Sequence, residues 1–166
     1  MGASGSHTSK VWIMPDLYAF TRYQDREMDE LWARGMVELS ETFALRQHEF
    51  GFLVNSKVVG LAATNRLFHD VLDTDSNKLV DKFETMCLVL LCSSLSNEKK
   101  VKLMFDLFNF NGKGYLVESE ISMLCLSVLT VVSKVDTNWP IPKKPMWKHV
   151  VQLALRHFAK MDPLTS

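Results

Sequence analysis

The sequence has no surplus of charge of either sign. Lys and Arg together number 19, Asp and Glu together number 19, and the formal net charge at pH 7 is zero. Proteins that bind nucleic acid do so largely through basic surfaces that contact phosphates. The two lysine pairs, Lys99-Lys100 and Lys143-Lys144, are too short to form such a surface. We therefore expect no nucleic-acid partner.

Cysteine is scarce, and it occurs only in apolar helical runs, at Cys87, Cys92 and Cys125. An odd number in such runs indicates buried thiols in a reducing compartment rather than a disulfide framework. The spacing also disfavours zinc, because Cys87 and Cys92 are five residues apart and no histidine completes a ligand set.

Long apolar runs are absent as well. The longest stretch, 123–132, is far short of the roughly 20 residues that a membrane helix needs. The first ten residues are small and polar, so no secretory signal is visible. The five histidines are scattered, and no nucleophile motif or glycine-rich phosphate loop occurs. These absences predict a cytoplasmic protein that is not an enzyme.

The most informative stretch that is present is residues 73–84, where oxygen ligands recur with the spacing of a calcium-binding loop. Calcium takes six to eight oxygens, and four of the five candidate side chains here are carboxylates. Asp81 would bind directly or through a water, Glu84 through two oxygens, and Leu79 through its backbone carbonyl. The candidate metal ligands are Asp73, Asp75, Asn77, Leu79, Asp81 and Glu84.

Apolar residues at helical spacing flank this loop on both sides, which predicts a helix before it and a helix after it. The upstream set is Leu67, Phe68, Val71 and Leu72, and the downstream set is Phe83, Met86, Cys87, Leu90, Leu91 and Leu95. The sixth place of the loop is usually glycine, but here it is Lys78. A positive φ at this residue would cost about 1 kcal/mol and weaken calcium binding.

A second loop with the same layout covers residues 109–120, after an apolar-periodic run that includes Val101, Met104 and Phe105. Its ligand set has no net charge, whereas the first loop offers four carboxylates. A lysine at its fifth place would put an ammonium where a cation should bind. We expect this degenerate loop to keep its shape and to bind no metal. The residues at its ligand places are Asn109, Asn111, Lys113, Tyr115 and Glu120.

With these two loops, residues 57–133 resemble two successive EF-hands, and the segments around both loops are similar to calcineurin B, the neuronal calcium sensors and calaxin-like ciliary proteins. The resemblance implies an all-α fold of paired helix-loop-helix repeats, with a short β-contact between the loops of a pair. It also implies a protein partner, typically an amphipathic helix, and a setting that is cytoplasmic, cytoskeletal or ciliary.

This layout divides the chain into an N-terminal arm at 1–26, a first pair of hands at 27–96, and a third region at 97–166. In the first pair, residues 27–56 resemble a degenerate hand that lacks ligands, with a helix at 28–39, a strand-like segment at 43–45 and a second helix, and residues 57–96 form the calcium-type hand. The third region holds the third hand, a proline-rich linker at 136–145 and a C-terminal helix from about 146 to 158, where the fourth hand stops before its loop.

An incomplete fourth hand would leave the strand-like Tyr115–Val117 without an internal partner, which predicts a homodimer or another protein at this edge. A truncated sequence is the alternative explanation. Residues 1–6 fit the N-myristoylation pattern with Gly2 as the acceptor, or they are an expression remnant. Membrane association is expected only if Gly2 is lipidated, and one acyl chain would make it reversible.

Residues 11–26 are rich in aromatic side chains. They form either an arm that docks into a groove or a segment that packs on the protein's own core, and the second is favoured. Two functions remain. The first is a calcium-responsive regulator that binds a partner helix through its single competent loop. The second is a calcium-insensitive structural adaptor or regulatory subunit.

Overall fold

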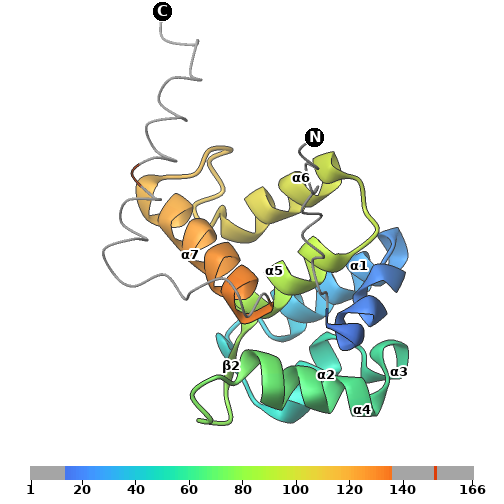
Figure 1. The fold of residues 1–166 in the computed structure, drawn as a ribbon. Coiled ribbons are helices and arrows are strands. Elements are labelled where there is room, and N and C mark those ends of the chain that lie inside the picture. The colour runs from blue at the N-terminus through green and yellow to red at the C-terminus, as the bar shows by residue number, and fades with distance from the viewer. Residues whose placement is uncertain (1–13, 136–151, 153–166) are drawn as a thin grey trace, which may run out of the picture.

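The computed structural model describes residues 14–135 and residue 152. This part of the chain is mostly helical, with one two-stranded sheet, so the prediction of a helical fold is confirmed at that level (Figure 1). The predictions about Gly2, the proline-rich linker, the C-terminal helix and the incomplete fourth hand concern residues outside the described part.

The first third of the described chain forms short helical segments around one strand. The predicted helix at 28–39 begins earlier, at Asp25, because the backbone N–H of Gln24 donates to a carboxylate oxygen of Glu27 at 3.2 Å and starts the helix there. The elements are η1 (Pro15–Arg22, a 3-10 helix), α1 (Asp25–Trp32), η2 (Ala33–Glu38, a π-helix), β1 (Ala44–Leu45) and α2 (Gln47–Leu53).

Two helix-loop-helix units follow. Gly60 separates the first two helices of this region. Its φ is 91°, a value that glycine adopts without steric cost. The elements are α3 (Ser56–Val59), α4 (Leu61–Arg66), η3 (Leu67–Leu72, a π-helix), β2 (Val80–Asp81), α5 (Lys82–Cys92), α6 (Asn97–Phe108) and α7 (Glu118–Val135).

The sheet joins the segment between η2 and α2 to the 73–84 loop. Strands β1 and β2 are antiparallel, with Ala44 opposite Asp81 and Leu45 opposite Val80. The backbone N–H of Lys82 extends the contact by donating to the carbonyl of Phe43 at 2.8 Å. The short β-contact expected between these two segments is therefore present. In contrast, residues 115–117, which we expected to be strand-like, do not form a strand.

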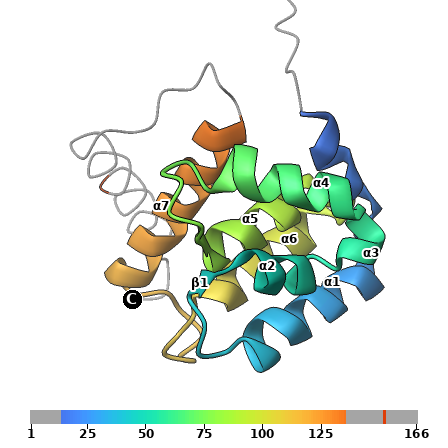
Figure 2. The same cartoon turned by 90° about the horizontal axis from the view of Figure 1, so that it is seen from below.

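Helix α5 lies at the centre of the molecule, in contact with α7, α6, η1 and β2 (Figure 2). We predicted an apolar stripe on one face, and Phe83, Met86, Cys87 and Leu90 of that stripe are buried, but so are Leu88 and Val89. Leu91, which we placed on the buried face, is exposed. The buried surface is wider than the predicted stripe because several elements pack around this helix.

The segment before α1 packs on the protein's own core. Leu17, Phe20 and Tyr23 are fully buried, and the Tyr23 hydroxyl donates to the carbonyl of Val54 at the end of α2. The rings of Phe20 and Tyr23 meet edge to face, with centroids 5.7 Å apart. For residues 14–26 the favoured alternative, packing on the protein's own core, is thus observed.

The three cysteines have free thiols. Cys87 is buried, whereas Cys92 and Cys125 are partly buried. Burial raises the pKa of Cys87 to about 12 and that of Cys92 to about 11, which keeps both as unreactive thiols at neutral pH. The expectation that Cys87 is a small core residue is confirmed.

Helix α7 spans 18 residues and includes the predicted exit helix at 123–132. Its β-branched residues do not interrupt it, because packing against α5 and α6 outweighs their weak helical preference. Within residues 14–135, none of the helices combines the length and the apolar character that crossing a bilayer would require.

Candidate functional site

The 73–84 loop connects η3 to α5, and both of its ends are anchored. At its start, the backbone N–H of Asp73 donates to the carbonyl of Phe68 at 2.9 Å, which is a π-helical bond. At its end, the side chain of Asp81 accepts from the N–H of Glu84 at 2.8 Å and caps α5. With β2 paired to β1, the loop has a fixed entry, a fixed exit and one strand contact.

Asp73 occupies the first ligand place and is 5% exposed. Its Oδ2 atom accepts from the backbone N–H of Lys78 at 3.1 Å. Its Oδ1 atom is buried and has no hydrogen-bond partner within the described residues. Burying a carboxylate oxygen without a partner is costly. A hard cation would supply the missing interaction, so Asp73 fits a calcium ligand.

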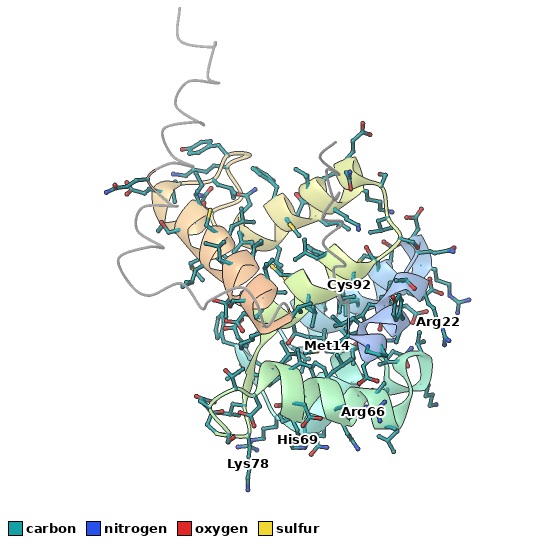
Figure 3. The ribbon with its side chains drawn as sticks, viewed as in Figure 1. Met14, Arg22, Arg66, His69, Lys78 and Cys92 are labelled. Atoms are coloured by element: carbon teal, nitrogen blue, oxygen red, sulfur yellow. The ribbon has the colours of Figure 1, made fainter. Side chains whose placement is uncertain are left out.

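The backbone of the loop turns through positive φ at two places. At the fourth place Ser76 has φ of 56°, and at the sixth place Lys78 has φ of 65°. The strain predicted at Lys78 is therefore present, and the side chain extends away from the protein (Figure 3). The 109–120 loop makes the same two turns with glycine, at Gly112 (64°) and Gly114 (76°). The two loops share a backbone path although their sequences differ.

The middle of the 73–84 loop is held by bonds between its own ligand residues. The Asn77 amide donates to Asp75 Oδ2 at 2.7 Å, and Asn77 Oδ1 accepts from the N–H of Leu79 at 2.8 Å. All three residues are exposed. Their oxygens therefore bond to neighbours at the rim of the loop.

Glu84, the predicted bidentate ligand, is paired with another element. Its Oε2 atom accepts from the ammonium of Lys134 near the end of α7, at 2.7 Å. The Lys134 ammonium also donates to the carbonyl of Leu72, the last residue of η3, at 2.9 Å. Burial raises the pKa of Glu84, and the hydrogen bond from Lys134 opposes this effect. The Glu84 carboxylate is thus held by a side chain from α7, outside the loop.

The 109–120 loop is closed by its own twelfth residue. Glu120 is 5% exposed, and its Oε2 atom accepts from the Asn111 amide and from the N–H of Val117, both at 2.8 Å. Its Oε1 atom accepts from the N–H of Asn111 at 3.1 Å. We expected Lys113 to obstruct this loop, but Lys113 is exposed, as is Tyr115. Glu120 and Asn111 close the loop instead.

The first ligand place of the 109–120 loop, Asn109, shares one feature with the first ligand place of the 73–84 loop, Asp73. Asn109 Oδ1 is buried without a hydrogen-bond partner in the described structure, like Asp73 Oδ1. The difference is charge, because an amide oxygen attracts a cation less than a carboxylate does. Among the residues that the structure describes, no three Asp, Glu, His or Cys side chains converge on one point as a metal centre.

Two lysines near the loops are functional candidates that the sequence did not indicate. Lys134 is described above, and the second is Lys82, which is 2% exposed. Its ammonium donates to the carbonyl of Leu39 at 2.7 Å and to that of Gly35 at 3.1 Å, at the end of η2. Both lysines thus neutralise the carbonyl end of a π-helix that leads into a loop. In the sequence, Lys134 is marked as a charged residue in a mostly apolar run, whereas no such signal marks Lys82, which lies between Asp81 and Phe83.

Comparison with known proteins gives no family for this chain. No protein-family model matches the sequence, and no solved structure matches it. The functional argument therefore depends on the loops themselves.

Proposed function

We propose that this protein is a calcium-binding EF-hand regulatory protein with one competent loop, residues 73–84, and that calcium controls its binding to a partner helix. The observation that carries the proposal is the buried, unpartnered Oδ1 atom of Asp73 at the first ligand place. The positive φ at the sixth place supports it, because a twelve-residue calcium loop makes a sharp turn there.

In this proposal Asp73 and Glu84 are the principal ligands, because both are carboxylates with little exposure at the two ends of the loop. Asp75, Asn77 and Asp81 add oxygens from the rim, and Leu79 adds its carbonyl. Calcium would supply concentrated positive charge to four nearby carboxylates, of which only Glu84 has an ion-pair partner among the described residues. Strain at Lys78 reduces the affinity, so we expect micromolar or weaker binding.

The β-contact gives the loop a route to the rest of the protein. The paired residues Val80 and Asp81 immediately precede α5, the helix at the centre of the core. A change at Glu84, in the first turn of α5, would act on a helix that contacts α7, α6 and η1. This arrangement is how a single ion could alter surfaces on several helices.

The proposed partner is an amphipathic helix that binds an apolar groove. Phe52 on α2 and Leu61 on α4 are exposed beside a hollow that lies between these two helices. Met123 and Leu126 on α7 are also exposed. Self-association through 115–117 stays a second prediction, and sedimentation equilibrium at high micromolar concentration tests it: a strictly monomeric species would contradict it.

The second candidate is a calcium-insensitive structural adaptor or regulatory subunit. The Lys134–Glu84 ion pair favours it, because an internal cation already satisfies the twelfth place of the loop. The bonds from Lys82 to Gly35 and Leu39 favour it too, since they fix the degenerate first region without any metal.

Isothermal titration calorimetry with calcium distinguishes the two candidates. Glu84→Gln removes a proposed ligand, and Glu120→Gln is the matched control in the other loop. The regulator predicts one site in the wild type, a large loss of affinity in Glu84→Gln, and wild-type affinity in Glu120→Gln. Equal effects of the two variants would contradict the assignment of the loops. If neither the wild type nor the two variants release or absorb heat up to millimolar calcium, the calcium-insensitive adaptor is the candidate that remains.

A further inference from the structure

Lys134 connects three elements that meet at the 73–84 loop. It lies one residue before the end of α7, yet its ammonium contacts Glu84 in the first turn of α5 and Leu72 at the end of η3. The lysine side chain is 11% exposed and the Glu84 side chain is 17% exposed. Figure 1 shows the carboxyl end of α7 beside β2 and the start of α5.

The chemistry of this contact resembles that of a bound cation. An ammonium carries a positive charge and three donors, and it has no acceptor. Here it uses two donors, one on a carboxylate and one on a backbone carbonyl, and both are oxygen atoms at the ends of the loop. A calcium ion that takes both oxygens of Glu84 would compete with Lys134 for Oε2, because two positive charges at one carboxylate oxygen repel each other.

The 109–120 loop shows what a loop without such a lysine does. Its Glu120 turns back and bonds to Asn111 and Val117 within the loop. Glu84 makes no such bond within the described structure, although its own N–H is bonded to Asp81. The twelfth residue of one loop is therefore satisfied locally, and that of the other is satisfied by a helix 50 residues away in sequence.

We propose that Lys134 is an internal competitor of calcium for Glu84, and that calcium loading releases the carboxyl end of α7 from η3 and α5. The proposal rests on calcium binding at 73–84, the function proposed above. It adds the element whose contacts change on calcium binding. The carboxyl end of α7 is held by Lys134 without calcium and is released when calcium is bound. The apolar residues of α7 that pack on α5 then become the surface under calcium control.

The test compares Lys134→Met with Lys99→Met by calcium calorimetry. Both substitutions remove one ammonium and one ion pair, because Lys99 bonds to Asp25 at 2.6 Å on the surface. A charged hydrogen bond in a partly buried site is worth about a tenfold change in an equilibrium constant or more. Lys134→Met should therefore bind calcium at least about tenfold more tightly than the wild type, and Lys99→Met should match the wild type.

A second measurement requires no variant that might misfold. Hydrogen exchange of the wild-type protein should show faster exchange at the last two turns of α7 in saturating calcium than without it. Exchange in α6, which makes none of the Lys134 contacts, should stay the same.

The outcomes separate the two proposals. If the wild type binds calcium at 73–84 but Lys134→Met has equal or weaker affinity and α7 exchange does not change, competition by Lys134 is refuted and calcium binding stands. If neither the wild type nor Lys134→Met binds calcium, the proposed function is refuted as well. If Lys134→Met alone binds calcium, the lysine blocks the loop completely, which confirms competition in its strongest form.

Discussion

Replacing Lys78 by glycine should stabilise the protein, which is unusual for a substitution to glycine. Lys78 holds φ of 65° at the sixth place of the loop, and its exposed side chain makes no described bond. Its one fixed interaction, the backbone N–H donated to Asp73 Oδ2 at 3.1 Å, survives the change. The substitution therefore alters backbone strain and little else.

Two opposing terms give the magnitude. A left-handed conformation costs a residue with a Cβ atom about 1–2 kcal/mol, and glycine avoids that cost. Glycine also gains about 0.5–1 kcal/mol of conformational entropy in the unfolded chain, which opposes folding. The difference leaves Lys78→Gly more stable than the wild type by about 0–1.5 kcal/mol, with the middle of both ranges giving about 0.8 kcal/mol.

Urea unfolding monitored by circular dichroism measures this difference. Lys113→Gly is the matched control, because Lys113 is an exposed lysine at the fifth place of the other loop and has no positive φ. It should lose about 0.5–1 kcal/mol, since only the entropy term applies. If Lys78→Gly loses as much stability as Lys113→Gly, the strain argument at the sixth place is wrong.

Two further substitutions test packing around the site. Tyr23→Phe should lower the free energy of unfolding by about 1–2 kcal/mol because the carbonyl of Val54 loses its donor. In the same urea assay Tyr18→Phe, at an exposed ring, should change it very little. Burial raises the pKa of Tyr23, so above the ordinary value of about 10 the unfolded chain loses this proton first. Stability should then fall as pH rises through 10, and the fall should be smaller in Tyr23→Phe; equal slopes would contradict this. Lys82→Met should lower the free energy of unfolding by about 1–3 kcal/mol because two carbonyls lose their donor. Lys102→Met, at an exposed lysine, is its control. Equal unfolding midpoints of the two variants would exclude a structural role for Lys82.

The sequence was informative where structure is local. The positive φ at Lys78 was expected from the calcium-loop pattern, and the strand-like segment at 43–45 from the resemblance to EF-hands. The boundaries of the 73–84 loop and the helices around it follow from residue types within a few positions of each other. Such features depend on φ preferences and on apolar spacing, which the sequence carries directly. The pairing of residues 44–45 with 80–81 also agreed with expectation, although it came from the resemblance to EF-hands.

The sequence was uninformative where a residue depends on distant neighbours. Helix α5 buries most of its surface because α7, α6, η1 and β2 contact it, and no periodicity within α5 specifies those neighbours. The partner of Glu84 is 50 residues away on α7, and the carbonyls that Lys82 bonds are more than 40 residues away on η2. We predicted Glu84 to be a calcium ligand from the loop spacing alone. That spacing describes a calcium-bound loop and gives no information about a lysine that contacts the same carboxylate.

The most direct test of the central claim is a calcium titration followed by residue-resolved amide NMR of the wild-type protein. The account predicts shifts that saturate together in residues 73–84 and at the carboxyl end of α7, with little change in residues 109–120. Shifts centred on 109–120, or an unchanged spectrum up to millimolar calcium, would contradict it.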